Sequence, residues 1–115
     1  MIVGAALVEI CVHESRSLKA KRGVVRSIQQ RVRNHFHIAV SEVGGQGTWQ
    51  IAQLGLSAVG SEAEPVRSVL HRAIAFIEEL HLAEVLDSDV EILTIPHRDA
   101  LSPELMDPAQ WDFEE

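Results

Sequence analysis

The sequence has no tyrosine and few aromatic residues of any kind: its 115 residues include two Trp and three Phe. Proteins that stack nucleic-acid bases interleave aromatic and basic side chains, and this chain lacks that pattern. It has a single cysteine, Cys11, so no disulfide can form within the chain. No apolar run approaches the roughly 20 residues of a membrane-spanning helix. The apolar stretch after Met1 has no basic leader, so we expect a β-strand there, no signal peptide, and a cytoplasmic protein.

The common signatures of catalysis and of metal binding are also missing. The sequence contains no P-loop, no nucleophile elbow and no dinucleotide-binding fingerprint. Its six histidines do not show the paired spacing of zinc ligands. Glu9, Glu14 and Glu42 are the one candidate group for an acid–base pair, on strands that we expect to be adjacent. We predict a protein that is not an enzyme and that uses neither a cofactor nor a metal ion.

Charge is distributed unevenly along the chain, whose formal net charge is −7. Seven of its ten Lys and Arg residues lie between Arg16 and Arg33, and no acid occurs between Glu14 and Glu42. The rest of the chain is therefore strongly acidic. This asymmetry indicates a polar molecule with one cationic face. An acidic total weakens non-specific nucleic-acid binding, but it leaves room for a local basic patch that binds anions.

Apolar periodicity and cap residues predict four strands and two helices. The strands are expected at residues 2–12, 37–43, 48–59 and 90–95, and the helices at residues 18–35, capped by Ser17, and beyond a cap at Ser61. Residues 87–89, Asp-Ser-Asp, are typical of a turn. The order predicts an α+β, ferredoxin-like βαββαβ domain at residues 1–95, with a four-stranded antiparallel sheet and two helices on one face. Residues 96–115 are expected to form an acidic C-terminal tail.

The sheet face that the helices leave uncovered is expected to be apolar. In the first strand, Val3, Ala5 and Leu7 alternate with residues that are themselves apolar. An antiparallel sheet with two apolar faces needs cover on both. We expect a homodimer packed sheet to sheet. The tail, which carries Trp111 and Phe113, is the alternative cover.

A basic segment occupies the expected start of the first helix, where cations are unfavourable. The first turn of a helix carries unsatisfied N–H groups and about half a positive charge. Arg16, Lys19, Lys21 and Arg22 therefore indicate an anion-binding site, although a solvated helix face is the usual explanation of such a run. Lys21 falls on the apolar arc, so it either snorkels outward or meets a polar group beneath it. The predicted anion- or nucleic-acid-binding residues are Ser15, Arg16, Ser17, Lys19, Lys21, Arg22, Arg26 and Arg33.

Trp49 and Gln50 follow a glycine-rich connection between the second and third expected strands. We expect Trp49 to pack in the core or at a dimer interface, and stacking on an exposed base is the alternative. Gln50 is a weaker candidate for polar contacts at the same place.

Four strings in the sequence carry a family resemblance. Ser15-Arg-Ser-Leu-Lys-Ala-Lys-Arg22, Ser41-Glu-Val43, Trp49-Gln50 and Leu54-Gly55 together resemble the YlxP-like family of small bacterial proteins. The similarity extends over about residues 1–95. It implies a ferredoxin-like fold, a cytoplasmic protein without established activity, and a gene that often lies among those for translation initiation and ribosome maturation.

The basic helix and the implied gene neighbourhood together favour a non-enzymatic protein that contacts RNA or the ribosome. Two alternatives stay open. In the first, a homodimeric interaction module docks an acidic protein segment on its basic face. In the second, the basic segment binds a small phosphate compound or a nucleotide.

Overall fold

The protein is described from a computed structural model, which covers residues 1–13, 15–45 and 48–96. Its elements are β1 (Ile2–Cys11), α1 (Leu18–Phe36), β2 (Ala39–Gly44), β3 (Ile51–Gly60), α2 (Ala63–Glu79) and β4 (Glu84–Thr94). All strand pairs are antiparallel, and the sheet order is β2-β3-β1-β4. The predicted α+β ferredoxin-like fold is therefore confirmed. Residues 97–115, nearly all of the predicted acidic tail, lie outside the described residues.

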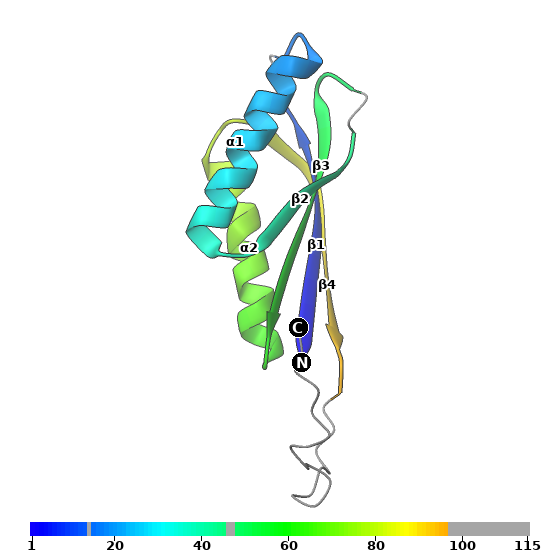
Figure 1. The fold of residues 1–115 in the computed structure, drawn as a ribbon, viewed down its shortest axis with the longest axis vertical. Helices are drawn as coiled ribbons and strands as arrows, with labels where there is room; N and C mark the ends of the chain where they lie inside the picture. The colour runs from blue at the N-terminus through cyan, green and yellow to red at the C-terminus, as the bar shows by residue number, and fades with distance from the viewer. Residues whose placement is uncertain (14, 46–47, 97–115) are drawn as a thin grey trace, which may run out of the picture.

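Both helices cover the same face of the sheet (Figure 1). Their buried apolar side chains are Val25, Ile28 and Val32 in α1 and Val66, Leu70, Ala73, Ile74 and Ile77 in α2. They pack on alternate strand residues such as Val8, Ile10 and Leu54, which are fully buried. Burial of each large aliphatic side chain contributes about 1.5–3 kcal/mol. The sheet and helices thus share one core, and the opposite face of the sheet is left open.

The first turn of α1 is fixed as predicted, because the Ser17 Oγ accepts a hydrogen bond of 3.1 Å from the Ala20 N–H. The predicted cap of α2 is wrong by one residue. Glu62, not Ser61, is the N-cap, and its side chain makes no capping hydrogen bond. At the other end of α1, His37 adopts a left-handed conformation with φ of 55°. That residue ends the helix, so β2 starts at Ala39, later than expected.

The last strand is longer than the sequence indicated. We expected a turn at residues 87–89 and a strand at 90–95, whereas β4 begins at Glu84. The strand pairs with β1 over its whole length, and this tertiary pairing overrides the turn propensity of the Asp-Ser-Asp string. The pairing contains a β-bulge next to the Asp-Ser-Asp string. Glu9 pairs with Asp87 and Ile10 with Val85, which leaves Leu86 as the extra residue.

Residues 1 and 95 are paired at one end of the sheet. The Met1 amino group donates to the Ile95 carbonyl oxygen at 2.8 Å, and the Ile95 N–H donates to the Met1 carbonyl oxygen at 2.8 Å. The start of α1 lies at the opposite end of the domain (Figure 1). Neither α1 nor α2, the helices of the described residues, is long and apolar enough to cross a membrane.

Candidate functional site

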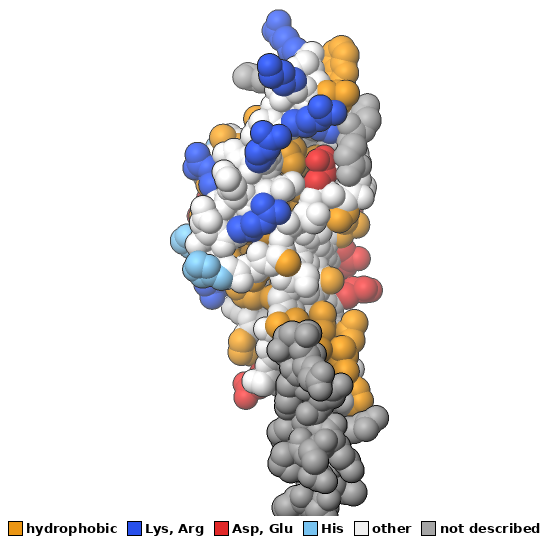
Figure 2. Space-filling view, viewed as in Figure 1, with side chains coloured by type: hydrophobic (Ala, Val, Ile, Leu, Met, Phe, Trp, Pro, Cys, Tyr) orange, Lys and Arg blue, Asp and Glu red, His pale blue; other side chains and the backbone are white. Residues whose placement is uncertain are grey.

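Three exposed cationic side chains, Lys19, Arg22 and Arg26, share one face of α1, and a fourth, Arg16, lies just before the helix. We call these four residues the basic column. The three helical members are three and four residues apart, the spacing that places side chains on one helix face. With a rise of 1.5 Å per residue, these three extend along about 10 Å of α1. Figure 2 shows Lys and Arg side chains gathered along the α1 side of the molecule.

The basic column has no acidic partner among the described residues. The three ion pairs recorded there involve His13, Lys21 and Arg67. The first turn of α1 contains no acid either. Each cation near the positive end of the helix dipole costs roughly 0.3–1 kcal/mol. In this part of the protein, therefore, the first turn of α1 has an unfavourable charge arrangement that a bound anion would relieve.

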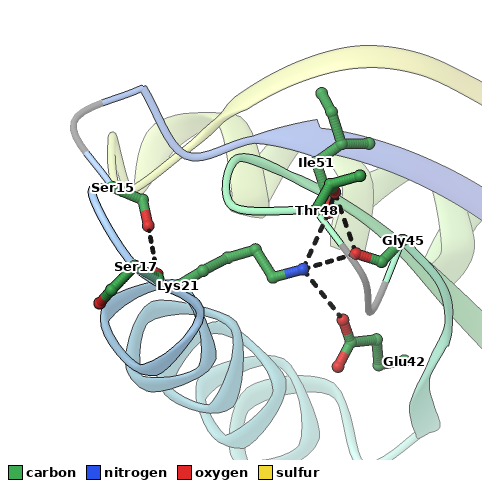
Figure 3. Close-up of polar contacts among 7 residues, drawn as sticks. All are labelled: Ser15, Ser17, Lys21, Glu42, Gly45, Thr48 and Ile51. Atoms are coloured by element: carbon green, nitrogen blue, oxygen red, sulfur yellow. Dashed lines mark hydrogen bonds and ion pairs between the residues drawn. The ribbon is translucent and has the colours of Figure 1, made fainter.

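Lys21 does not belong to this column, which corrects its prediction as an anion ligand. Its side chain is buried, with 1% of its surface exposed. Its Nζ donates hydrogen bonds to the carbonyl oxygens of Gly45, at 2.6 Å, and Ile51, at 3.1 Å (Figure 3). Lys21 thus occupies its ammonium group inside the protein, where it joins α1 to the connection between β2 and β3.

A carboxylate and a hydroxyl complete this buried cluster. Glu42 Oε2 lies 4.0 Å from Lys21 Nζ, is buried, and has no hydrogen-bond partner among the described residues. Thr48 Oγ1 lies 2.8 Å from the Ile51 carbonyl oxygen and 3.0 Å from that of Gly45. The Lys21 charge therefore offsets a carboxylate oxygen that has no hydrogen-bond partner among the described residues, and the cluster holds the base of the β2–β3 connection in place.

Three other predicted ligands are also engaged within the protein. Ser15 is buried, and its Oγ donates to the Ser17 carbonyl oxygen at 2.9 Å, so it shapes the turn before α1. Ser17 uses its own hydroxyl oxygen as the helix cap. The Arg33 guanidinium donates to the Val40 carbonyl oxygen and joins α1 to β2. Of the predicted residues, the four of the basic column have exposed charged groups that make no hydrogen bond or ion pair with other described residues.

Trp49 lies at the surface of the chain, with 59% of its area exposed. The expectation that it packs in the core of this chain is therefore wrong, while a role in stacking or at an interface stays a prediction. The Gln50 side chain donates from Nε2 to the His13 backbone carbonyl oxygen at 3.1 Å. The backbone carbonyl oxygen of Gln50 accepts from the Val12 N–H at 2.7 Å. Gln50 thus secures the end of β1.

Two of the carboxylates considered for acid–base chemistry, Glu9 and Glu42, do not come together. Glu9 lies on the open face, where Gln53 Nε2 donates to its Oε2 at 3.3 Å. Glu42 lies beneath α1 beside Lys21, on the helix side of the sheet. In addition, β3 separates β1 from β2 in the sheet order. Glu14 lies outside the described residues.

The open face of the sheet combines apolar and acidic rows. Exposed large apolar side chains include Leu7 of β1, Val59 of β3 and Leu93 of β4, each at least 46% exposed. Next to them, β4 carries acids at Asp87, Asp89 and Glu91, which pair in register with Glu9, Leu7 and Ala5 of β1. The expectation of an apolar second face is confirmed for β1 and for the outer end of β3, whereas β4 adds negative charge.

Sequence reasoning missed a contact between the ends of β1 and β4. His13 Nε2 lies 2.5 Å from Glu84 Oε1, although 71 positions separate the two residues in the chain. Both side chains line a cleft of about 800 Å³ beside the start of α1. No local spacing reveals this pair, because the β1–β4 register creates it. Within the described part of the chain, no group of three or more His, Cys, Asp and Glu residues is arranged to hold a metal ion.

Comparisons with known proteins agree with the sequence resemblance. Residues 3–90 match the model of a family described as "Protein of unknown function (DUF503)". The chain is 39% identical over 77 residues to "Uncharacterized protein YlxP" of Bacillus subtilis (strain 168), an alignment that covers 67% of this chain and 84% of that protein. A solved structure, "De novo designed protein Foldit4", aligns with a TM-score of 0.48 and 13% identity, over 84% of this chain and 100% of that one.

Proposed function

The chain belongs to the DUF503 family of proteins of unknown function, and we propose that it binds the phosphate backbone of RNA along the basic column. The observation that carries the proposal is the set of three exposed cations on one face of α1, with Arg16 just before the helix, all unpaired among the described residues. Two of them, Arg16 and Lys19, lie at the helix start, where the backbone N–H groups also favour an anion.

The shape of the basic column favours a repeating polyanion over a single small anion. Its three helical members succeed one another along about 10 Å of helix, whereas one phosphate group contacts two or three donors at a single point. Arg16 and Arg26, at the two ends, therefore contact different phosphates. With few aromatic side chains available for stacking, affinity rests on phosphate contacts and depends little on base sequence.

Salt dependence measures the number of phosphates that are contacted. Each phosphate neutralised on a single strand releases counterions and contributes about 0.7 to the slope of log K against log salt. Four contacts therefore predict a slope of about 3. The alternative ligand, an acidic protein segment, lacks this condensed counterion layer, so its binding gives a shallower slope.

The proposal is tested by fluorescence anisotropy with labelled ribosomal RNA fragments at several salt concentrations. The variant Lys19→Gln/Arg22→Gln is expected to bind about tenfold more weakly and to lower the slope by about 1.4. Arg67→Gln/Arg72→Gln on α2 is the matched control, because it removes the same charge from another helix. Equal affinity of both double variants for RNA would exclude the basic column as the binding surface.

We further propose that a second copy of the chain covers the open face. A sheet of three strands of ten or eleven residues and one of six presents roughly 600 Å² of flat area, close to the ~800 Å² that each partner buries in a standard interface. The acidic C-terminal tail is the poorer occupant, because its six acids and one Arg would lie beside Asp87, Asp89 and Glu91. A dimer would also present two basic columns to one RNA molecule, which raises its avidity.

A further inference from the structure

A cleft lies where α1 begins and α2 ends. It measures about 800 Å³, within the range of about 300–1,000 Å³ that is usual for small-molecule sites. Its walls come from the end of β1, the first two turns of α1, the last turn of α2 and the start of β4. This cleft is separate from the exposed face of α1 that carries the basic column.

The side chains that line the cleft indicate the charge of the ligand that it would bind. Its apolar surface includes Val12, Val24 and Leu82, which are buried or half-buried. Among the described lining residues, the acids are Glu78 and Glu84, the histidines are His13 and His81, and neither Lys nor Arg contributes. The two carboxylates therefore face no Lys or Arg within the described lining of the cleft.

Two further features strengthen the preference for a cation. The last turn of α2 contains no basic residue, so the partial negative charge of that helix end is not compensated by its own side chains. Glu78 lies in this turn and has no side-chain partner among the described residues. Glu84 is held through Oε1 by His13, which leaves its second oxygen as an acceptor.

We propose that the cleft binds an organic cation, an ammonium or guanidinium group carried on an apolar body. The head group lies between the carboxylates of Glu78 and Glu84, where charge-assisted hydrogen bonds form. The apolar body covers Val24 and Leu82. Neither Arg16 nor Lys19 lines the cleft. This site does not depend on the proposed RNA binding.

The proposal is tested by titrating ¹⁵N-labelled full-length protein with n-hexylamine, and with hexanol and hexanoate as neutral and anionic controls of the same chain length. Hexylamine is expected to shift the amide signals of Val24, Leu82 and Glu84 with a Kd of about 1 mM, an ordinary efficiency for seven non-hydrogen atoms. Hexanol and hexanoate are expected to bind at least about tenfold more weakly, a difference of ~1.4 kcal/mol.

Variants separate the site from general charge effects. Glu78→Gln and Glu84→Gln are each expected to weaken hexylamine binding by about fivefold or more. Glu79→Gln removes the same charge from the next position, outside the cleft lining, and is expected to leave binding unchanged. Thermal unfolding of each variant verifies that it is folded.

Nα-acetyl-lysine methylamide, titrated in parallel, identifies the source of the cation. Tighter binding than hexylamine indicates a side chain of a partner protein, and weaker binding indicates a free amine; both results support the cation site. Equal affinity for hexylamine and hexanol would overturn the proposal, as would equal losses in Glu78→Gln and Glu79→Gln. So would the absence of amide shifts at about 10 mM hexylamine, a concentration that saturates most of a 1 mM site.

Discussion

Lys21 Nζ donates a hydrogen bond of 2.6 Å to the Gly45 carbonyl oxygen, across 24 positions of sequence. This contact places the ammonium group of an α1 residue at the base of the β2–β3 connection. It also explains why one basic residue of the segment differs in role from its neighbours. Lys19 and Arg22, on either side, are exposed, whereas Lys21 faces the sheet and compensates Glu42.

Replacing Lys21 should destabilise the fold. Lys21→Met is expected to lower the free energy of unfolding by about 3 kcal/mol, because it leaves the buried Glu42 oxygen without a cation. Urea unfolding measures this change. Lys21→Met/Glu42→Gln should recover about 1 kcal/mol or more, since the stranded charge is gone. Lys19→Met, an exposed control, should change stability by less than about 0.5 kcal/mol. Equal losses for Lys21→Met and Lys19→Met would contradict the buried ion pair.

The first turn of α1 should show a conflict between stability and binding. Lys19→Glu places an acid near the positive helix end, so the free energy of unfolding is expected to rise by about 0.5 kcal/mol. The same change should weaken RNA binding by more than tenfold. Arg26→Glu, two turns further along, should weaken binding similarly with a smaller gain in stability, because the dipole effect is confined to the first turn. A loss of stability in Lys19→Glu would show that the cation is not unfavourable at this position.

The oligomeric state should depend on the open face. Leu7 is 46% exposed in the middle of β1, so Leu7→Arg is expected to convert a dimer into a monomer without unfolding it. Sedimentation velocity at micromolar concentrations measures the change. Ala75→Arg, at an exposed position of α2, is the matched control and should stay dimeric. A wild-type protein that sediments as a monomer would disprove the proposed interface.

The fold was predictable because its helices carry local signals. Ser17 caps α1, and the apolar residues that follow it keep helical spacing, so the sequence located both this helix and its buried stripe. The strand pattern and the two helices together indicated the topology. The start of β4 was missed for the opposite reason. Asp87 and Asp89 favour a turn in isolation, and only the pairing with β1 makes them part of a strand.

The site was predictable only in part. Helical spacing placed Lys19, Arg22 and Arg26 on one face, but it could not show that Ser15 and Arg33 use their donors within the protein. For Lys21, the apolar arc indicated two outcomes, and the carbonyl groups of Gly45 and Ile51 decided between them. The pair of His13 and Glu84, and the cleft beside it, arise from the register of strands that are far apart in the chain.

The central position of β1 has a consequence for how the chain acquires its structure. The first strand to be synthesised pairs with β3 and with β4, whose residues are made last among the described elements. The edge of β1 that pairs with β4 therefore stays unpaired until most of the domain has been synthesised, and such distant pairing slows folding. A chain interrupted before Glu84 would expose the unpaired edge of β1 to other molecules, which makes it prone to aggregation.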